Sequence, residues 1–93
     1  MNVSILSANK SLYQGTATAV ALPGAKSPFT VLDNHAPIIS LLSKGVIAID
    51  NGSDNTVSIE IAGGFVEIHN NEVTACVELV WNEHYPFYYS VAS

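Results

Sequence analysis

Residues 59–77 read IEIAGGFVEIHNNEVTACV, and the alternation of apolar and polar side chains in this stretch decides the fold. The pattern continues outward to residue 56 on one side and residue 79 on the other. It predicts three short strands, over residues 56–61, 65–69 and 72–79. Two corners are expected between these strands, the first at Gly63 and Gly64 and the second at Asn70 and Asn71. A slip of one residue would turn Glu60 and Glu72 inward, so the pattern also sets which face of the sheet is buried.

The remainder of the chain repeats this pattern in shorter segments. Further strands are expected over residues 1–7, 16–22, 29–32, 38–42 and 46–50, with residues 11–15 as a short link. No segment shows a sustained helical period, and Val, Ile and Thr dominate the expected strands. These observations predict an all-β fold, a two-layer antiparallel β-sandwich or flattened barrel of short strands over residues 1–80.

Length and charge exclude several classes of protein. The 93 residues suffice for one domain, and the net charge is −5 with only three lysines, scattered along the sequence, and no arginine. Nucleic-acid binding and direct adhesion to an anionic membrane are therefore not expected. Cys76 is the only cysteine, which rules out an internal disulfide and is read as a structural residue.

The sequence contains no recognisable active site. His35, His69 and His84 are widely separated, and none has zinc-type spacing with Cys76. Glu60 and Glu67 are interpreted as solvated residues of an outer face rather than as an acid and base pair. We therefore expect no catalytic residue, no metal, no cofactor and no small-molecule substrate, and we disfavour a small hydrolase. Binding through surfaces and loops remains.

The last thirteen residues are unusually aromatic. Residues 81–93 are expected to form a tail that packs on the sandwich through its aromatic side chains, Trp81, Tyr85, Phe87, Tyr88 and Tyr89. A disordered tail is the simpler interpretation. A different class of function also depends on these residues: a stand-alone β-sandwich that binds a peptide or a glycan through an aromatic platform.

Four segments in a fixed order carry a family resemblance. LPG at residues 22–24, HAP at 35–37, AGGFVEI at 62–68 and EVT at 72–74 together resemble the N-terminal β-sandwich of the epsilon subunit of F-type ATP synthases. The resemblance covers roughly residues 1–80. It implies a non-catalytic rotor component of the central stalk that binds the gamma subunit and the c-ring and couples proton or sodium flow to ATP synthesis. It also implies a peripheral position at the cytoplasmic face of the bacterial inner membrane, reached only through the complex.

The resemblance also assigns contact residues. The family's loop that meets the c-ring matches Gly24, Ala25, Lys26, Ser27, Pro28 and Phe29, and this chain has Lys26 and Pro28 where the family often has an acidic residue. Substitutions at Gly24 and Pro28 are expected to weaken coupling and to leave the fold intact. The gamma-facing surface matches Ser7, Ala8, His35, Ala36 and Pro37. For His35, a turn residue bonded to the backbone and an interface residue are both open interpretations.

The chain departs from the family pattern after the sandwich. Family members commonly continue into two antiparallel helices that regulate ATP hydrolysis and, in some, bind ATP. Here the last residues are aromatic and read as extended, so neither property is carried over. A natural short form and an excised domain are both compatible with the sequence.

Overall fold

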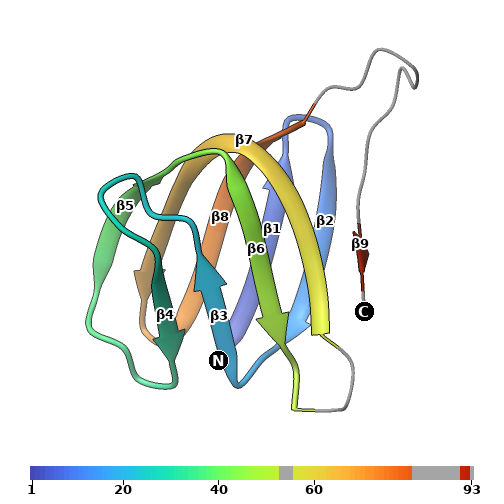
Figure 1. Cartoon of the computed structure of the whole chain (residues 1–93). Coiled ribbons are helices and arrows are strands. Elements are labelled where there is room, and N and C mark those ends of the chain that lie inside the picture. The colour runs from blue at the N-terminus through green and yellow to red at the C-terminus, as the bar shows by residue number, and fades with distance from the viewer. Residues whose placement is uncertain (53–55, 81–90, 93) are drawn as a thin grey trace.

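The computed structural model describes residues 1–52, 56–80 and 91–92, and these contain strands and no helix. The strands are β1 (Asn2–Ser7), β2 (Lys10–Thr16), β3 (Ala19–Leu22), β4 (Phe29–Leu32), β5 (Ile38–Leu42), β6 (Gly45–Asp50), β7 (Thr56–His69), β8 (Glu72–Leu79) and β9 (Val91–Ala92). Figure 1 shows them wrapped into two layers around one interior. The predicted all-β sandwich is confirmed.

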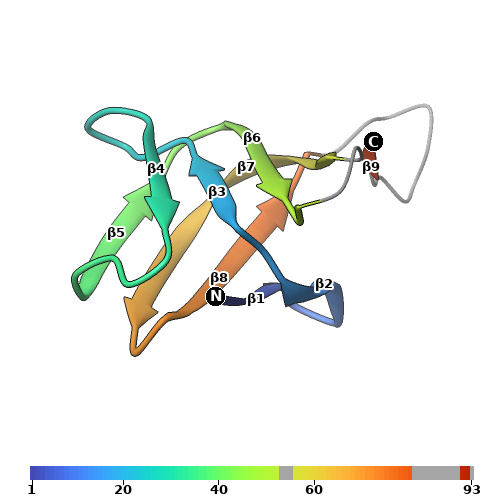
Figure 2. The same ribbon diagram turned by 90° about the horizontal axis from the view of Figure 1, so that it is seen from below.

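Strand β7 belongs to both layers. Its first half pairs with β6, which continues through β3 to β4, and its second half pairs with β5 on the same side. On its other side β7 pairs with β8, which continues through β1 to β2, and with the short β9 at Ser58 and Ile59. Figure 2, viewed along the sandwich from below, shows β7 passing from one layer to the other.

The predicted corner at Gly63 and Gly64 is wrong. Residues 56–69 form one continuous strand of 14 residues, and the register with β8 shifts between Ile61 and Gly63, as in a β-bulge. The bulge explains a change in the buried positions along β7. Ile59 and Ile61 are buried before it, whereas Val66 and Ile68 are buried after it. The glycines therefore bend the strand between layers instead of ending it.

The corner at Asn70 and Asn71 is confirmed as the turn between β7 and β8. Both residues have positive φ, 52° and 60°, which is the combination found in type I′ hairpin turns. Asparagine tolerates this left-handed conformation better than most other residues.

The core consists entirely of aliphatic side chains. No described polar or charged side chain is buried. The buried positions alternate along the strands as the sequence predicts, and they are Val3, Ile5, Ala17, Val20, Leu22, Val31, Leu42, Ile47, Ile49, Ile59, Ile61, Val66, Ile68, Val73, Ala75 and Val77. Such a core gains stability from the apolar area removed from water and contains no partner for a charge.

Two features of the sheet differ from the sequence prediction. The expected short link over residues 11–15 lies inside β2, and the expected strand over 16–22 begins only at Ala19. In addition, β1 and β8 are parallel, with Val3 beside Val73, so the sheet is not purely antiparallel. Strand β2 is an edge strand without apolar alternation, so no local pattern predicts it. The pairing of β1 with β8 joins residues seventy positions apart, which no local pattern predicts either.

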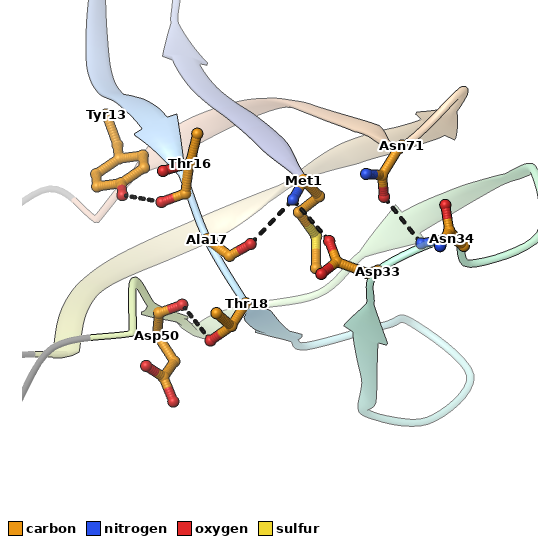
Figure 3. Close-up of polar contacts among 9 residues, drawn as sticks. All are labelled: Met1, Tyr13, Thr16, Ala17, Thr18, Asp33, Asn34, Asp50 and Asn71. Atoms are coloured by element: carbon orange, nitrogen blue, oxygen red, sulfur yellow. Dashed lines mark hydrogen bonds and ion pairs between the residues drawn. The ribbon is translucent and has the colours of Figure 1, made fainter.

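The chain's amino terminus closes one end of the sandwich (Figure 3). The Met1 ammonium donates to the Ala17 carbonyl at 3.1 Å and to Asp33 Oδ1 at 2.7 Å. Nearby, the Asn34 N–H donates to Asn71 Oδ1 at 2.8 Å, and Thr18 donates to the Asp50 carbonyl. These contacts connect the β4–β5 corner, the β7–β8 turn and the start of the chain.

Candidate binding surface

The loop between β3 and β4 is held against the end of β5 by main-chain hydrogen bonds. Ala25 N donates to Leu41 O at 2.9 Å, and Ser43 N donates to Pro23 O at 2.8 Å. A β-bridge joins Gly24 to Leu42 between these two bonds. The loop is therefore an extension of the sheet, and residues 25–28 project from it exposed to solvent.

Gly24 is required by the shape of this loop. A β-carbon at this position would overlap the carbonyl oxygen of Ser27 and would lie 2.9 Å from the Phe29 ring. A larger residue must displace the loop backbone. The expectation that a substitution at Gly24 would spare the local fold is therefore wrong, whereas Pro28 is exposed and remains a suitable position for a test.

A groove of about 530 Å³ separates this loop from β5. The loop side is formed by Ala25, Lys26, Ser27 and Phe29, and the opposite side by His35, Ile38, Ile39, Ser40 and Leu41. The structure thus brings the loop predicted to meet the c-ring and His35, predicted to meet gamma, to the two sides of one groove. Their proximity results from the Gly24–Leu42 bridge and is not visible in the sequence.

The β5 side of the groove is strongly apolar. Ile39 is 72% exposed and Leu41 is 69% exposed, and both lie on the outer face of the strand. Leu41 is in register with Phe65 of β7, which is 46% exposed. Large apolar side chains gathered on one outer face indicate a surface that another molecule covers.

Ile38, Ile39 and Leu41 line the groove and were not among the residues predicted from the sequence. Their signal is the sequence IISLL, which is apolar on both faces of the strand. A strand with this pattern is either buried on both faces or covered by a partner on one. Ile39 and Leu41 are mostly exposed, so no described part of the chain covers the outer face of β5.

His35 makes the backbone bond of the first interpretation, and its role at an interface stays a prediction. Its Nδ1 lies 2.7 Å from the Ala36 carbonyl oxygen, which can only accept, so Nδ1 carries the proton of this bond. The ring also lines the groove. The backbone bond therefore orients the ring, and its Nε2 is left to accept a hydrogen bond when the ring is neutral or to donate one when it is charged.

Ser7 and Ala8 do not join this surface. They lie at the β1–β2 turn, whereas residues 35–37 lie at the β4–β5 corner, at the opposite end of the sandwich (Figure 1). Trp81, Tyr85, Phe87, Tyr88 and Tyr89, on which the packed tail and the peptide- or glycan-binding alternative depend, lie outside the described residues.

The described part of the chain also bears on the metal-type groupings considered from the sequence. Residues 1–52 and 56–80 contain no cluster of three histidine, cysteine or acidic side chains that could hold a metal. Cys76 is a free thiol, half-buried on β8 beside Phe65. The part of the chain that is described also has no helix of the length and apolarity needed to cross a bilayer.

Comparison with known proteins decides the family. Residues 1–82 match the family described as ATP synthase, Delta/Epsilon chain, beta-sandwich domain. The chain belongs to this family. The epsilon-type sandwich is therefore confirmed, and the four sequence segments that suggested it lie within the matched residues.

Individual relatives agree with the family assignment. The ATP synthase epsilon chain of Leptospira borgpetersenii serovar Hardjo-bovis is 38% identical over 74 residues, which cover 80% of this chain and 58% of that protein. This chain spans little more than half the length of the curated epsilon chains that it matches.

Solved structures share the fold of the epsilon-type domain. A chain in the structure of the Euglena gracilis mitochondrial ATP synthase (OSCP/F1/c-ring) superposes with a TM-score of 0.76 at 16% identity, over 81% of this chain and 48% of that one. A chain in the structure of the Tetrahymena thermophila mitochondrial ATP synthase (central stalk/c-ring) superposes with a TM-score of 0.70 at 15% identity. The superposition covers 83% of this chain and 62% of that one. The sandwich is thus shared at low sequence identity.

Proposed function

We propose that this chain is a non-catalytic rotor subunit of an F-type ATP synthase, which joins the gamma subunit to the c-ring and helps couple ion flow to ATP synthesis. The family match over residues 1–82 supports this proposal most directly. The relatives named epsilon chain and the fold shared with chains of central-stalk assemblies agree with it. The subunit is peripheral, held at the cytoplasmic face of a bacterial inner membrane through the complex.

The β3–β4 loop is the proposed c-ring contact. Residues 25–28 are exposed, and the hydrogen bonds from Ala25 to Leu41 and from Ser43 to Pro23 hold them in place. Proline at positions 23 and 28 further limits the conformations that the loop can adopt. A loop that transmits torque must keep its shape under load, and these features supply that stiffness.

The groove and the His35–Pro37 corner are the proposed gamma contact. The exposed faces of Ile39 and Leu41 offer the apolar area, and His35 offers a polar group at its margin. Buried aliphatic and aromatic residues usually supply most of the binding energy of an interface. A gamma segment in this groove would touch the same loop that meets the ring. The contact proposed at Ser7 and Ala8 would be a second, separate surface.

Binding of gamma by surface variants tests the proposal. Leu41→Asp places a charge in the groove and is expected to weaken gamma binding by at least about 100-fold, because an unpaired charge would be buried in the interface. Val46→Asp is the matched control, since Val46 is 47% exposed on β6 and lies outside the groove. Equal gamma affinity of both variants, measured by calorimetry, would contradict the assignment of the groove.

Coupling is tested in membranes that contain the whole enzyme. Pro28→Asp is expected to reduce ATP-driven ion pumping while the isolated chain keeps its melting temperature, because Pro28 is exposed. Failure of the unmodified chain to assemble with gamma and the c-ring would refute the rotor function itself.

A further inference from the structure

The three lysines of the chain, scattered in the sequence, lie in connections at the same end of the fold, with the β1–β2 turn across the molecule from the β3–β4 loop (Figure 1). Lys10 begins β2, Lys26 lies in the β3–β4 loop, and Lys44 lies between β5 and β6. Figure 1 shows these three connections at the upper end of the sandwich. We call the segments 8–10, 23–28 and 43–44 the lysine end. None of these segments contains an acidic residue.

The lysine side chains are available to a partner. All three residues are exposed, and none forms an ion pair with another described residue. Lys26 and Lys44 are placed by the same piece of backbone, because Lys26 follows Ala25 and Lys44 follows Ser43, both of which hydrogen-bond across the loop junction. Their positions relative to each other are therefore set before any partner arrives.

The opposite end of the sandwich carries the opposite sign. Asp33, Asp50 and Glu72 lie at or beside its turns, although Asp33 is paired with the Met1 ammonium. Glu60 and Glu78 lie on strand positions closer to the lysine end, in register with Val46 and Gly63. In a protein of net charge −5, the connections at the lysine end thus carry lysines and no acidic residue, and these exposed cations favour approach to a negative surface.

We infer that the lysine end binds a protein surface that presents carboxylates. This inference rests on the proposed function, in which the β3–β4 loop meets the c-ring, and it states the polarity of that contact: the ring's loops supply acid groups to Lys26 and Lys44. Anionic lipid is the less suitable partner. Membrane-binding basic patches usually contain about four to eight clustered cations. This chain has only three lysines and a net charge of −5.

The test measures binding of the c-ring, purified in detergent, to the immobilised chain over a range of KCl concentrations. Lys26→Glu is expected to weaken binding about tenfold. The double variant Lys26→Glu with Lys44→Glu is expected to bind more weakly still, because each reversal of charge places a carboxylate opposite the acid groups of the ring. The pair Gln14→Glu and Leu32→Glu changes the net charge as much as Lys26→Glu does, at exposed positions away from the lysine end, and should leave the affinity unchanged. Affinity of the unmodified chain should fall as KCl rises.

A charge exchange identifies the partner group. Replacing an acidic residue of the ring's polar loop by lysine should restore binding of the Lys26→Glu chain. Unchanged ring affinity in the double lysine variant would overturn the inference and leave the rotor function standing, whereas no binding of the unmodified chain would overturn both. Binding of the chain to phosphatidylglycerol vesicles without the ring, lost on Lys26→Glu, would assign the lysine end to lipid instead.

Discussion

The backbone of Gly64 passes directly against the carbonyl oxygen of Cys76 on the neighbouring strand. A β-carbon at residue 64 would overlap that oxygen and would lie 2.8 Å from the α-carbon of Val77. Gly64 also has φ of 150°, a conformation that side chains disfavour. The bend that carries β7 between the layers therefore depends on glycine at this position.

Gly64→Ala is expected to lower the free energy of unfolding by at least about 2 kcal/mol, because strain at φ and a backbone clash add together. Gly63→Ala is the matched control. A β-carbon on Gly63 meets only the Leu42 carbonyl oxygen, at an ordinary 3.5 Å. Urea denaturation of both variants measures the difference, and equal losses would show that the close approach at Gly64 is not limiting.

The turn after β7 gives a second matched pair. Asn71→Gly keeps the left-handed backbone easy to adopt but removes the Oδ1 that accepts from Asn34 N–H, and should cost about 0.5–1.5 kcal/mol. Asn70→Gly relieves the same kind of backbone conformation, and its side chain has no such bond within the described residues. It is therefore expected to be neutral or slightly stabilising. Thermal melts that rank the variants in the reverse order would contradict this account of the turn.

Asp33 makes stability depend on pH in the acid range. Its hydrogen bond to the Met1 ammonium, together with the attraction between the two charges, holds the pKa of the Asp33 carboxyl below its ordinary value. A carboxyl with a lowered folded-state pKa stabilises the protein above its unfolded pKa, about 3.9, and loses this contribution as pH falls through the folded pKa. Asp33→Asn should therefore be less stable than the unmodified chain at pH 6. At the lowest pH where the chain still folds, the two should differ little in stability.

Glu67→Gln is the control for this measurement, because Glu67 is exposed and its side chain forms no hydrogen bond or ion pair with another described residue. Urea midpoints of the unmodified chain and both variants between pH 6 and pH 2.5 give the two profiles. Parallel profiles for the unmodified chain and Asp33→Asn would show that the contact with Met1 does not contribute.

Stability and binding should separate on β5 and β6. Ile47 is fully buried, so Ile47→Ala should cost about 2–5 kcal/mol in unfolding free energy. Leu41→Ala removes a side chain that is 69% exposed, and should change that free energy by less than about 0.5 kcal/mol. For gamma affinity the order is reversed: Leu41→Ala is expected to weaken binding more than Ile47→Ala does. Loss of stability in Leu41→Ala comparable to that in Ile47→Ala would place Leu41 in the core.

The sequence predicted those parts of the fold that depend on a local pattern. Strands β4, β5 and β8 have the expected limits, and the buried residues of β8 alternate as expected. Strand β2 escaped detection because its sequence, KSLYQGT, has no buried residue and so no alternation to detect. Gly63 and Gly64 were interpreted as a turn because paired glycines usually form one, whereas here they allow two backbones to approach closely.

The candidate site was predictable only in part. The resemblance named the loop and His35 separately, and nothing local relates Phe29 to Leu41 across the groove. Their proximity follows from the bridge between Gly24 and Leu42, which is a tertiary contact. The lysine end was hidden for the same reason, since Lys10, Lys26 and Lys44 are brought to one end by the fold alone.

Because one uninterrupted strand, β7, supplies backbone partners to both layers, neither layer can come apart while the other persists. Amide protons of β6 and of β8 should consequently exchange with solvent through the same opening event, at the free energy of complete unfolding. Under rotation the domain would then respond as a single cooperative body, and compliance in the stalk would have to arise at its joints with neighbouring subunits.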